Sequence, residues 1–136
     1  MKERYVLDAN ALIDFLESGP GMRKVDQLLQ AAARDHADLA VSVMNLGEVF
    51  YYSMVKRGEE QARKAVQGLT ESPIGVVPVE LPCALRAGEL KARHKIPYVD
   101  CIAAALAIER QATLVTADRH FEKLGRSFPV LWLPRR

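Results

Sequence analysis

Cysteine and long apolar runs are scarce in this sequence, and each scarcity excludes a class of protein. The two cysteines, Cys83 and Cys101, are too few for a disulfide framework and are predicted to be reduced, half-buried small side chains. The longest stretch without a charged residue, Leu39 to Gly47, spans nine residues, whereas a membrane-spanning helix needs about 20. The N-terminus lacks the apolar segment of a signal peptide. We therefore expect a soluble, cytoplasmic protein that does not contact a membrane.

Two kinds of catalytic motif are also missing. No GxGxxG or GxxxxGK[ST] loop is present to hold a nucleotide phosphate. The three histidines, His36, His94 and His120, have no nucleophile beside them in a recognisable motif. Covalent catalysis of the Ser-His-Asp or Cys-His type is therefore not expected.

The composition is typical of one ordinary globular domain spanning residues 1–136. Of these residues 49% are hydrophobic and 26% are charged, and 19 Lys and Arg against 17 Asp and Glu give a net charge of +2. The pI of about 8.6 lies below the value of about 9 that nucleic-acid-binding domains often exceed. Affinity for phosphate is thus permitted but not required.

Short apolar runs alternate with longer helical patterns along the chain. This alternation predicts an α/β fold with a largely parallel sheet. Strands are expected at residues 5–7, 39–42, 75–79, 113–116 and 130–133. Helices are expected at residues 10–16, 22–34, 44–56, 59–69, 81–94 and 100–109, with a short segment at 120–124.

Four acidic residues lie at the ends of these expected elements. Asp8 follows the first strand, and Asp118 lies two residues past the fourth. Asp100 begins the alanine-rich helix, and Glu48 lies one turn into the helix after the second strand. Because ligands of parallel sheets collect outside the carboxyl ends of the strands, these four side chains are expected to converge. Each also has a structural alternative, since the aspartates can cap helices and Glu48 can be a solvated helix residue.

Converging carboxylates need a partner of opposite charge. Like charges a few ångströms apart repel and raise each other's pKa, so at neutral pH the cluster requires a proton or a cation. Oxygen ligands without a nearby Cys or His pair suit Mg²⁺ or Mn²⁺. Such ions activate water and polarise phosphoryl oxygens, which indicates hydrolysis of phosphate esters.

Small polar residues accompany these acids. Asn10 lies two residues after Asp8, and Thr116 lies two residues before Asp118. Either is suited to hold a metal-bound water or a phosphate oxygen, although Asn10 can also cap its helix and Thr116 can be an ordinary strand residue. Ser42 and Asn45 are expected to cap the helix that carries Glu48.

Four segments of the chain resemble, in order and separation, the signature segments of the PIN-domain nucleases. The overall pattern looks most like the VapC toxins of prokaryotic toxin–antitoxin pairs and covers almost the whole sequence. The four segments are VLDANALI (residues 6–13), SVMNLGE (42–48), VDCIAAAL (99–106) and LVTADRHF (114–121).

The resemblance implies a Rossmann-like three-layer α/β/α sandwich and a Mg²⁺- or Mn²⁺-dependent endoribonuclease. Asp8 and Asp100 are expected to contact the principal metal, and Glu48 and Asp118 to complete the catalytic site directly or through water. The resemblance also implies a homodimer and a cognate VapB-like antitoxin. His120 occupies a position where many relatives carry an aspartate, and it is expected to be a surface residue or a phosphate contact.

An RNA substrate requires a basic surface. The candidates flank Asp100 and Asp118, and a solvated charged face is the alternative for each of them. The predicted RNA contacts are Arg119, Lys123, Lys91 and Arg93, with Arg86, Lys95 and Arg126 nearby.

Several alternatives remain open. Four large side chains, Phe50, Tyr51, Tyr52 and Met54, cannot all face one side of a helix, so some are expected at a dimer or antitoxin interface, or under the following helix. A housekeeping PIN nuclease of RNA maturation would need no antitoxin. A degenerate PIN domain would bind RNA or protein without turnover. A phosphatase with a nucleophilic Asp-x-Asp is disfavoured by Asn10.

Overall fold

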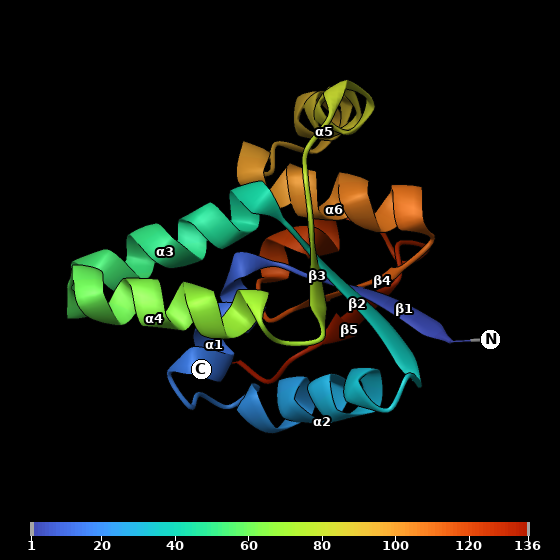
Figure 1. Cartoon of the computed structure of the whole chain (residues 1–136). Helices are drawn as coiled ribbons and strands as arrows, with labels where there is room; N and C mark the ends of the chain where they lie inside the picture. Colours follow the sequence, from blue (N-terminus) through green and yellow to red (C-terminus); the bar gives the residue numbers. More distant parts are fainter. Residues whose placement is uncertain (1, 136) are drawn as a thin grey trace.

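A five-stranded parallel sheet forms the centre of the computed structural model, which describes residues 2–135 (Figure 1). The strand order is β3-β2-β1-β4-β5, and every neighbouring pair is parallel. The strands are β1 (Glu3–Leu7), β2 (Ala37–Ser42), β3 (Ile74–Val77), β4 (Thr113–Thr116) and β5 (Val130–Trp132). All the carboxyl ends therefore meet at one edge of the sheet, as the alternating sequence pattern predicted.

Six α-helices and one short 3₁₀ helix connect the strands of the described chain. The helices are α1 (Ala9–Leu16), α2 (Met22–Ala33), α3 (Val43–Arg57), α4 (Glu59–Thr70), α5 (Leu81–His94), α6 (Tyr98–Arg110) and the 3₁₀ helix η1 (Arg119–Leu124). No helix among residues 2–135 is long and apolar enough to cross a membrane.

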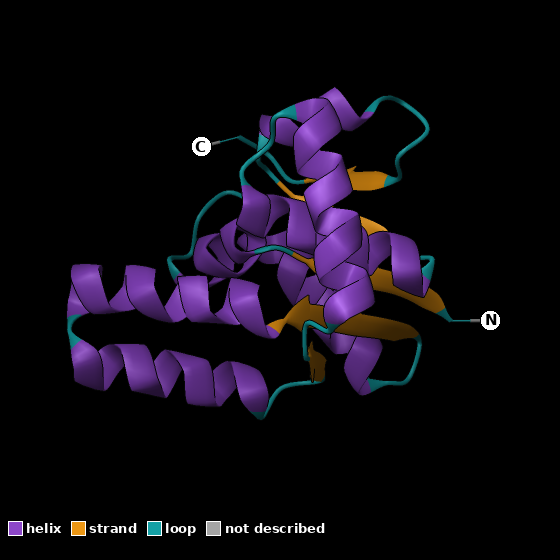
Figure 2. Ribbon diagram, turned by 90° about the horizontal axis from the view of Figure 1, so that it is seen from above, coloured by secondary structure: helices purple, strands orange, loops and turns teal. Residues whose placement is uncertain are grey.

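Two apolar layers enclose the sheet, which confirms the predicted α/β/α sandwich. Successive residues of a strand point to opposite faces, so Val6 packs toward α5 and α6 whereas Leu7 packs toward α1 and α2 (Figure 1). In β4, Leu114 packs on the same side of the sheet as Val6, and Val115 packs on the same side as Leu7. Helices α3 and α4 form an antiparallel hairpin that extends beyond the sheet (Figure 2).

Helix α6 begins earlier than its sequence pattern suggested. The expected start was Asp100, but the helix starts at Tyr98 with Pro97 as the N-cap residue, because proline carries no N–H that the first turn would leave unpaired. Asp100 is therefore a residue of the first turn, and its predicted alternative role as a cap is wrong. The alanines that follow are all buried, and their small side chains let α6 lie close to the sheet.

Candidate active site

Asp8 is fixed at the junction of β1 and α1. It is the N-cap of α1: its Oδ1 accepts a hydrogen bond from the Ala11 N–H at 2.8 Å, while its Oδ2 accepts one from the Thr116 hydroxyl at 2.6 Å. Only 2% of the residue is exposed. Burial raises the pKa of Asp8 to about 7, although both hydrogen bonds oppose this rise. Capping and a functional role thus coexist in one side chain.

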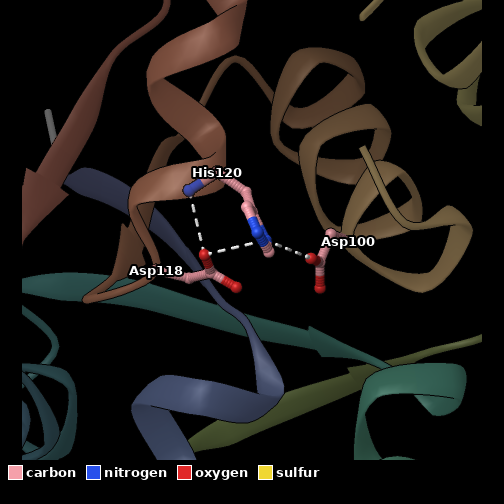
Figure 3. A group of neighbouring side chains, drawn as sticks. All are labelled: Asp100, Asp118 and His120. Carbon is pink, nitrogen blue, oxygen red and sulfur yellow. Dashed lines mark hydrogen bonds and ion pairs between the residues drawn. The ribbon is translucent and has the colours of Figure 1, made fainter. Parts of the chain in front are cut away.

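Asp118 and His120 lie together after β4. Asp118 caps η1, accepting the His120 N–H at 2.9 Å. The His120 Nδ1 lies 3.1 Å from an Asp118 carboxylate oxygen and 4.0 Å from Asp100 Oδ2. Figure 3 shows the imidazole between the two aspartates, whose ligand atoms and that of His120 all lie within 4.8 Å of one another. Oxygen and nitrogen donors from α6 and η1 are therefore close enough to share one ion.

Electrostatic interactions connect all four predicted acids. Burial, with the Asp118 and Glu48 carboxylates, raises the pKa of Asp100 to about 6, and His120 opposes the rise. Burial and Asp118 also raise the pKa of Glu48. Besides burial, the carboxylates of Asp100 and Asp118 in turn raise the pKa of Asp8. The structure thus brings the predicted residues together, and we call Asp8, Glu48, Asp100 and Asp118 the acidic cluster.

Parallel pairing of β1 with β4 explains how these distant residues meet. Leu7 is the register partner of Val115, so the residues that follow, Asp8 and Thr116, lie side by side. The Thr116 hydroxyl donates to Asp8 and accepts the Asp118 N–H at 2.9 Å. Asn10 Oδ1 accepts the Ala117 N–H at 3.1 Å. Both predicted supporting residues therefore position the acids, and the alternative of Asn10 as a cap is wrong because Asp8 occupies that position.

Ser42 and Asn45 fix the start of α3, which carries Glu48. Ser42 is the N-cap, as expected, and accepts the Asn45 N–H at 2.9 Å. Asn45 lies inside the helix, fully buried, so it is not a cap. Its amide donates to the Val99 carbonyl at 3.5 Å, which joins the start of α3 to the start of α6 beside Asp100.

The predicted RNA contacts are largely engaged within the protein. Lys91 donates to the Ile96 carbonyl at 3.3 Å, and Lys123 donates to the Lys95 carbonyl at 3.4 Å. The Arg93 guanidinium lies 3.8 Å from Glu89, and the Arg119 guanidinium lies 4.3 Å from the centre of the Trp132 ring. Each of these cations therefore has a contact within the protein that an RNA phosphate would have to compete with or leave in place.

His120 lies beside the acidic cluster, in a position that the sequence did not indicate. It was expected at the surface or against phosphate, and its side chain is 54% exposed, yet its ring nitrogen faces both aspartates. The available signal was its place two residues after a capping aspartate. An N-cap side chain accepts the backbone N–H of the second or third residue of the helix, so that residue lies close to the cap.

Comparison with known proteins gives a family and a set of similar structures. The family model of the PIN domain matches residues 5–127. No curated protein gives a significant match to the sequence.

Solved structures with the same fold come from toxin–antitoxin systems. A chain of VapBC2 from Rickettsia felis, bound to a promoter DNA fragment, superposes with a TM-score of 0.77 at 20% identity, covering 96% of this chain and 99% of that one. A toxin–antitoxin complex from Klebsiella pneumoniae gives 0.63 at 25% identity, covering 86% and 89%. VapC20 of Mycobacterium tuberculosis, a sarcin–ricin loop cleaving toxin, gives 0.72 at 17% identity, covering 89% and 95%.

Proposed function

The chain belongs to the PIN-domain family, and we propose that it is a metal-dependent endoribonuclease acting as the toxin of a VapBC-type pair. The observation that carries this proposal is the acidic cluster at the carboxyl edge of the parallel sheet. The similar structures support the toxin assignment, because those chains come from toxin–antitoxin systems.

The residues present fit a divalent cation. Three pKa values in the cluster, those of Asp8, Glu48 and Asp100, are raised by burial and by neighbouring carboxylates. The charged forms are therefore unfavourable unless a cation compensates them. Carboxylate oxygens are the ligands that Mg²⁺ and Mn²⁺ prefer, and the one nearby nitrogen, His120 Nδ1, is compatible with Mn²⁺.

Each residue then has a distinct task in hydrolysis. Bound Mg²⁺ or Mn²⁺ supplies Lewis-acid polarisation of the phosphate and a more acidic water. Asp8 and Asp100 would hold the ion, and Asp8 is fixed by its hydrogen bonds with Ala11 and Thr116. Glu48 and Asp118 would complete the site, and one of these two carboxylates would accept the proton of the attacking water. Asn10 and Thr116 keep the strand ends in register.

The apolar surface supports the two proposed protein partners. A groove of about 260 Å³ lies between α1, α3 and α4, with Ile13 and Tyr52 in its wall and Arg57 and Lys64 at its side. We assign it to a VapB-like antitoxin segment that carries apolar and acidic side chains.

Exposed apolar side chains on α3 and on α5 are candidates for a homodimer contact. On α3, Tyr51 is 69% exposed and Val55 is 72% exposed, and Leu81 and Leu85 of α5 are 69% and 61% exposed. Large exposed apolar side chains of this kind are typical of association surfaces. A dimer mass in solution, lost on Tyr51→Glu with the fold retained, is the expected result.

Substitution Asp8→Asn tests the nuclease proposal. The amide retains the capping oxygen but removes the charge, so RNA cleavage in saturating Mn²⁺ should fall roughly 100-fold or more, the scale of losing one charge-stabilising group. Asp26→Asn on α2 is the matched control, because it removes a carboxylate that bonds only Gln30. Equal cleavage by Asp8→Asn and wild type would remove Asp8 from the mechanism.

Expression with and without the neighbouring reading frame tests the toxin proposal. Growth should stop when the chain is expressed alone, and co-expression of the neighbouring small protein, or Asp8→Asn, should restore it. Mapping the cut RNA ends identifies the substrate. Unimpaired growth with active enzyme would favour a housekeeping nuclease.

A further inference from the structure

A pocket of about 550 Å³ lies between η1 and β5, apart from the acidic cluster. We call it the η1–β5 pocket. Its volume falls within the range of about 300–1,000 Å³ that is usual for ligand sites. Its main lining side chains are Glu122, Arg126, Phe128, Val130 and Trp132, with Phe121 at the base.

Both walls of the pocket belong to elements that also border the acidic cluster. Trp132 is the register partner of Thr116, whose hydroxyl contacts Asp8. Helix η1 begins immediately after Asp118. With a rise of about 2 Å per residue in a 3₁₀ helix, Glu122 lies about 8 Å along the helix from Asp118. The pocket is therefore close enough to the cluster, along η1, for a base to enter it while a neighbouring phosphate lies at the acids.

The lining combines flat apolar surfaces with positive charge. Phe128 and Trp132 present aromatic rings, on which any base can stack because every base has a π-face. Arg119 is not a lining residue, but its guanidinium lies 4.3 Å from the centre of the Trp132 ring, and its buried Nε has no hydrogen-bond partner within residues 2–135. Arg126 is exposed at the rim. Cations beside aromatic rings are complementary to a base attached to a phosphate backbone.

Glu122 adds a polar contact to this apolar lining. An ionised carboxylate only accepts hydrogen bonds, so it favours a base that presents an amino group. We propose that the η1–β5 pocket binds one unpaired base of the RNA strand, next to the phosphate that is cleaved. The proposal rests on the proposed nuclease function and adds to it a subsite that selects single-stranded substrate.

The single tryptophan makes the pocket directly observable. Trp132 is the only tryptophan in the sequence, so all of the protein's tryptophan fluorescence comes from the wall of this pocket. The probes are single-stranded homopolymeric oligoribonucleotides of each base and an abasic strand of equal length, titrated in EDTA so that no cleavage occurs. We expect saturable quenching by strands that carry bases, strongest for bases with an amino group, and little by the abasic strand.

Two variants test the lining. Phe128→Leu keeps an apolar side chain but removes the ring, and binding should weaken roughly 5- to 100-fold, the scale of one lost base–aromatic stack. Arg126→Gln, at an exposed position, should weaken binding and reduce its dependence on salt. Arg23→Gln on α2, at the opposite face of the sheet, removes the same charge and should leave binding unchanged. Thermal unfolding verifies that each variant is folded.

The outcomes separate this proposal from the proposed function. Equal quenching by the abasic strand, or wild-type binding by folded Phe128→Leu and Arg126→Gln, overturns the base subsite even when Mn²⁺-dependent cleavage is normal. Quenching by a peptide of the antitoxin and not by RNA assigns the pocket to a protein and also overturns it. Base-dependent quenching in a protein that cleaves no RNA supports the subsite and contradicts the nuclease function.

Discussion

Asp8 is a carboxyl group held where water does not reach it. Burial raises its pKa from an ordinary value of 3.8 to about 7, and the pKa of Asp100 rises in the same direction to about 6. Because these carboxyl groups are buried, their ionisation lowers the stability of the fold near neutral pH. Such a loss of stability is a common property of functional sites. The consequences are measurable for individual residues.

The unfolding free energy of the metal-free protein should fall as the pH rises from about 4 to about 7. In this window the unfolded chain has released the Asp8 proton and the folded protein still holds it, so raising the pH favours unfolding, by up to about 1.4 kcal/mol per pH unit. Asp8→Asn cannot ionise, so urea unfolding in EDTA should show its stability relative to wild type growing across this window. If the unfolding free energies of wild type and Asp8→Asn changed in parallel with pH, the raised pKa of Asp8 would be contradicted.

Thr116→Val should impair both stability and cleavage. Valine keeps the shape but loses the hydrogen bond to Asp8 and the acceptor for the Asp118 N–H, at a cost of about 1–3 kcal/mol for an unpaired buried group. Because the Thr116 hydrogen bond lowers the pKa of Asp8, the acidic limb of the pH–rate profile should move to higher pH. Thr116→Ser retains the hydroxyl and is the control. Identical pH–rate profiles for Thr116→Val and Thr116→Ser would show that the Thr116 hydroxyl does not influence the pKa of Asp8.

The sequence predicted the residues that obey a local rule and missed those that depend on tertiary contacts. Asp8 and Asp118 were found because strand ends are visible as apolar runs followed by an acid. The inward position of His120 and the stacking of Arg119 on Trp132 were not, since the short η1 has no periodicity and the ring belongs to another strand. The carbonyl partners of Lys91 and Lys123 were hidden for the same reason.

At the scale of elements, the junction between α1 and α2 depends on a close backbone approach. The Gly21 N–H donates to buried Asp14 Oδ2 at 2.5 Å, and a Cβ on Gly21 would lie 2.5 Å from that oxygen and 3.0 Å from Leu133. No side-chain cap is made at the start of α2. The position of α2 against the sheet therefore requires glycine at this residue.

Gly21→Ala should destabilise the protein by about 1–3 kcal/mol, the usual cost of overpacking. Gly68→Ala in α4 is the matched control, because its Cβ would meet no atom within 4 Å and alanine is favoured over glycine in a helix by about 0.5–1 kcal/mol. Urea denaturation should thus give changes of opposite sign for the two variants. Similar changes at both sites would mean that the Asp14 contact is unimportant.

The predicted elements agree with the observed ones to within two residues at their ends, and the disagreements have physical causes. The third strand ends at Val77 and not at residue 79, because Pro78 cannot donate to a neighbouring strand. The first strand pair extends back to Glu3 and Ala37, where the charged residues Glu3, Arg4 and Asp38 interrupt the apolar pattern.

At the scale of the whole molecule, a divalent ion should act as a stabiliser. A ligand that binds the folded state alone raises the unfolding free energy by about 2.7 kcal/mol at 100 times its dissociation constant. Mn²⁺ should therefore raise the melting temperature of wild type by several degrees, and EDTA should reverse the rise. The rise should be smaller in Asp8→Asn and unchanged in Asp26→Asn. A melting temperature indifferent to Mn²⁺ in wild type would argue against a metal site.

The order of the strands determines when this site is completed during synthesis. Strand β1 is made first, but its neighbour β4 begins at Thr113, after more than four fifths of the chain. A nascent polypeptide that already carries Asp8, Glu48 and Asp100 still lacks Asp118 and the strand that positions Thr116 against Asp8. The four acids can therefore assemble only in the final fifth of synthesis, once β4 and Asp118 have been added to the chain.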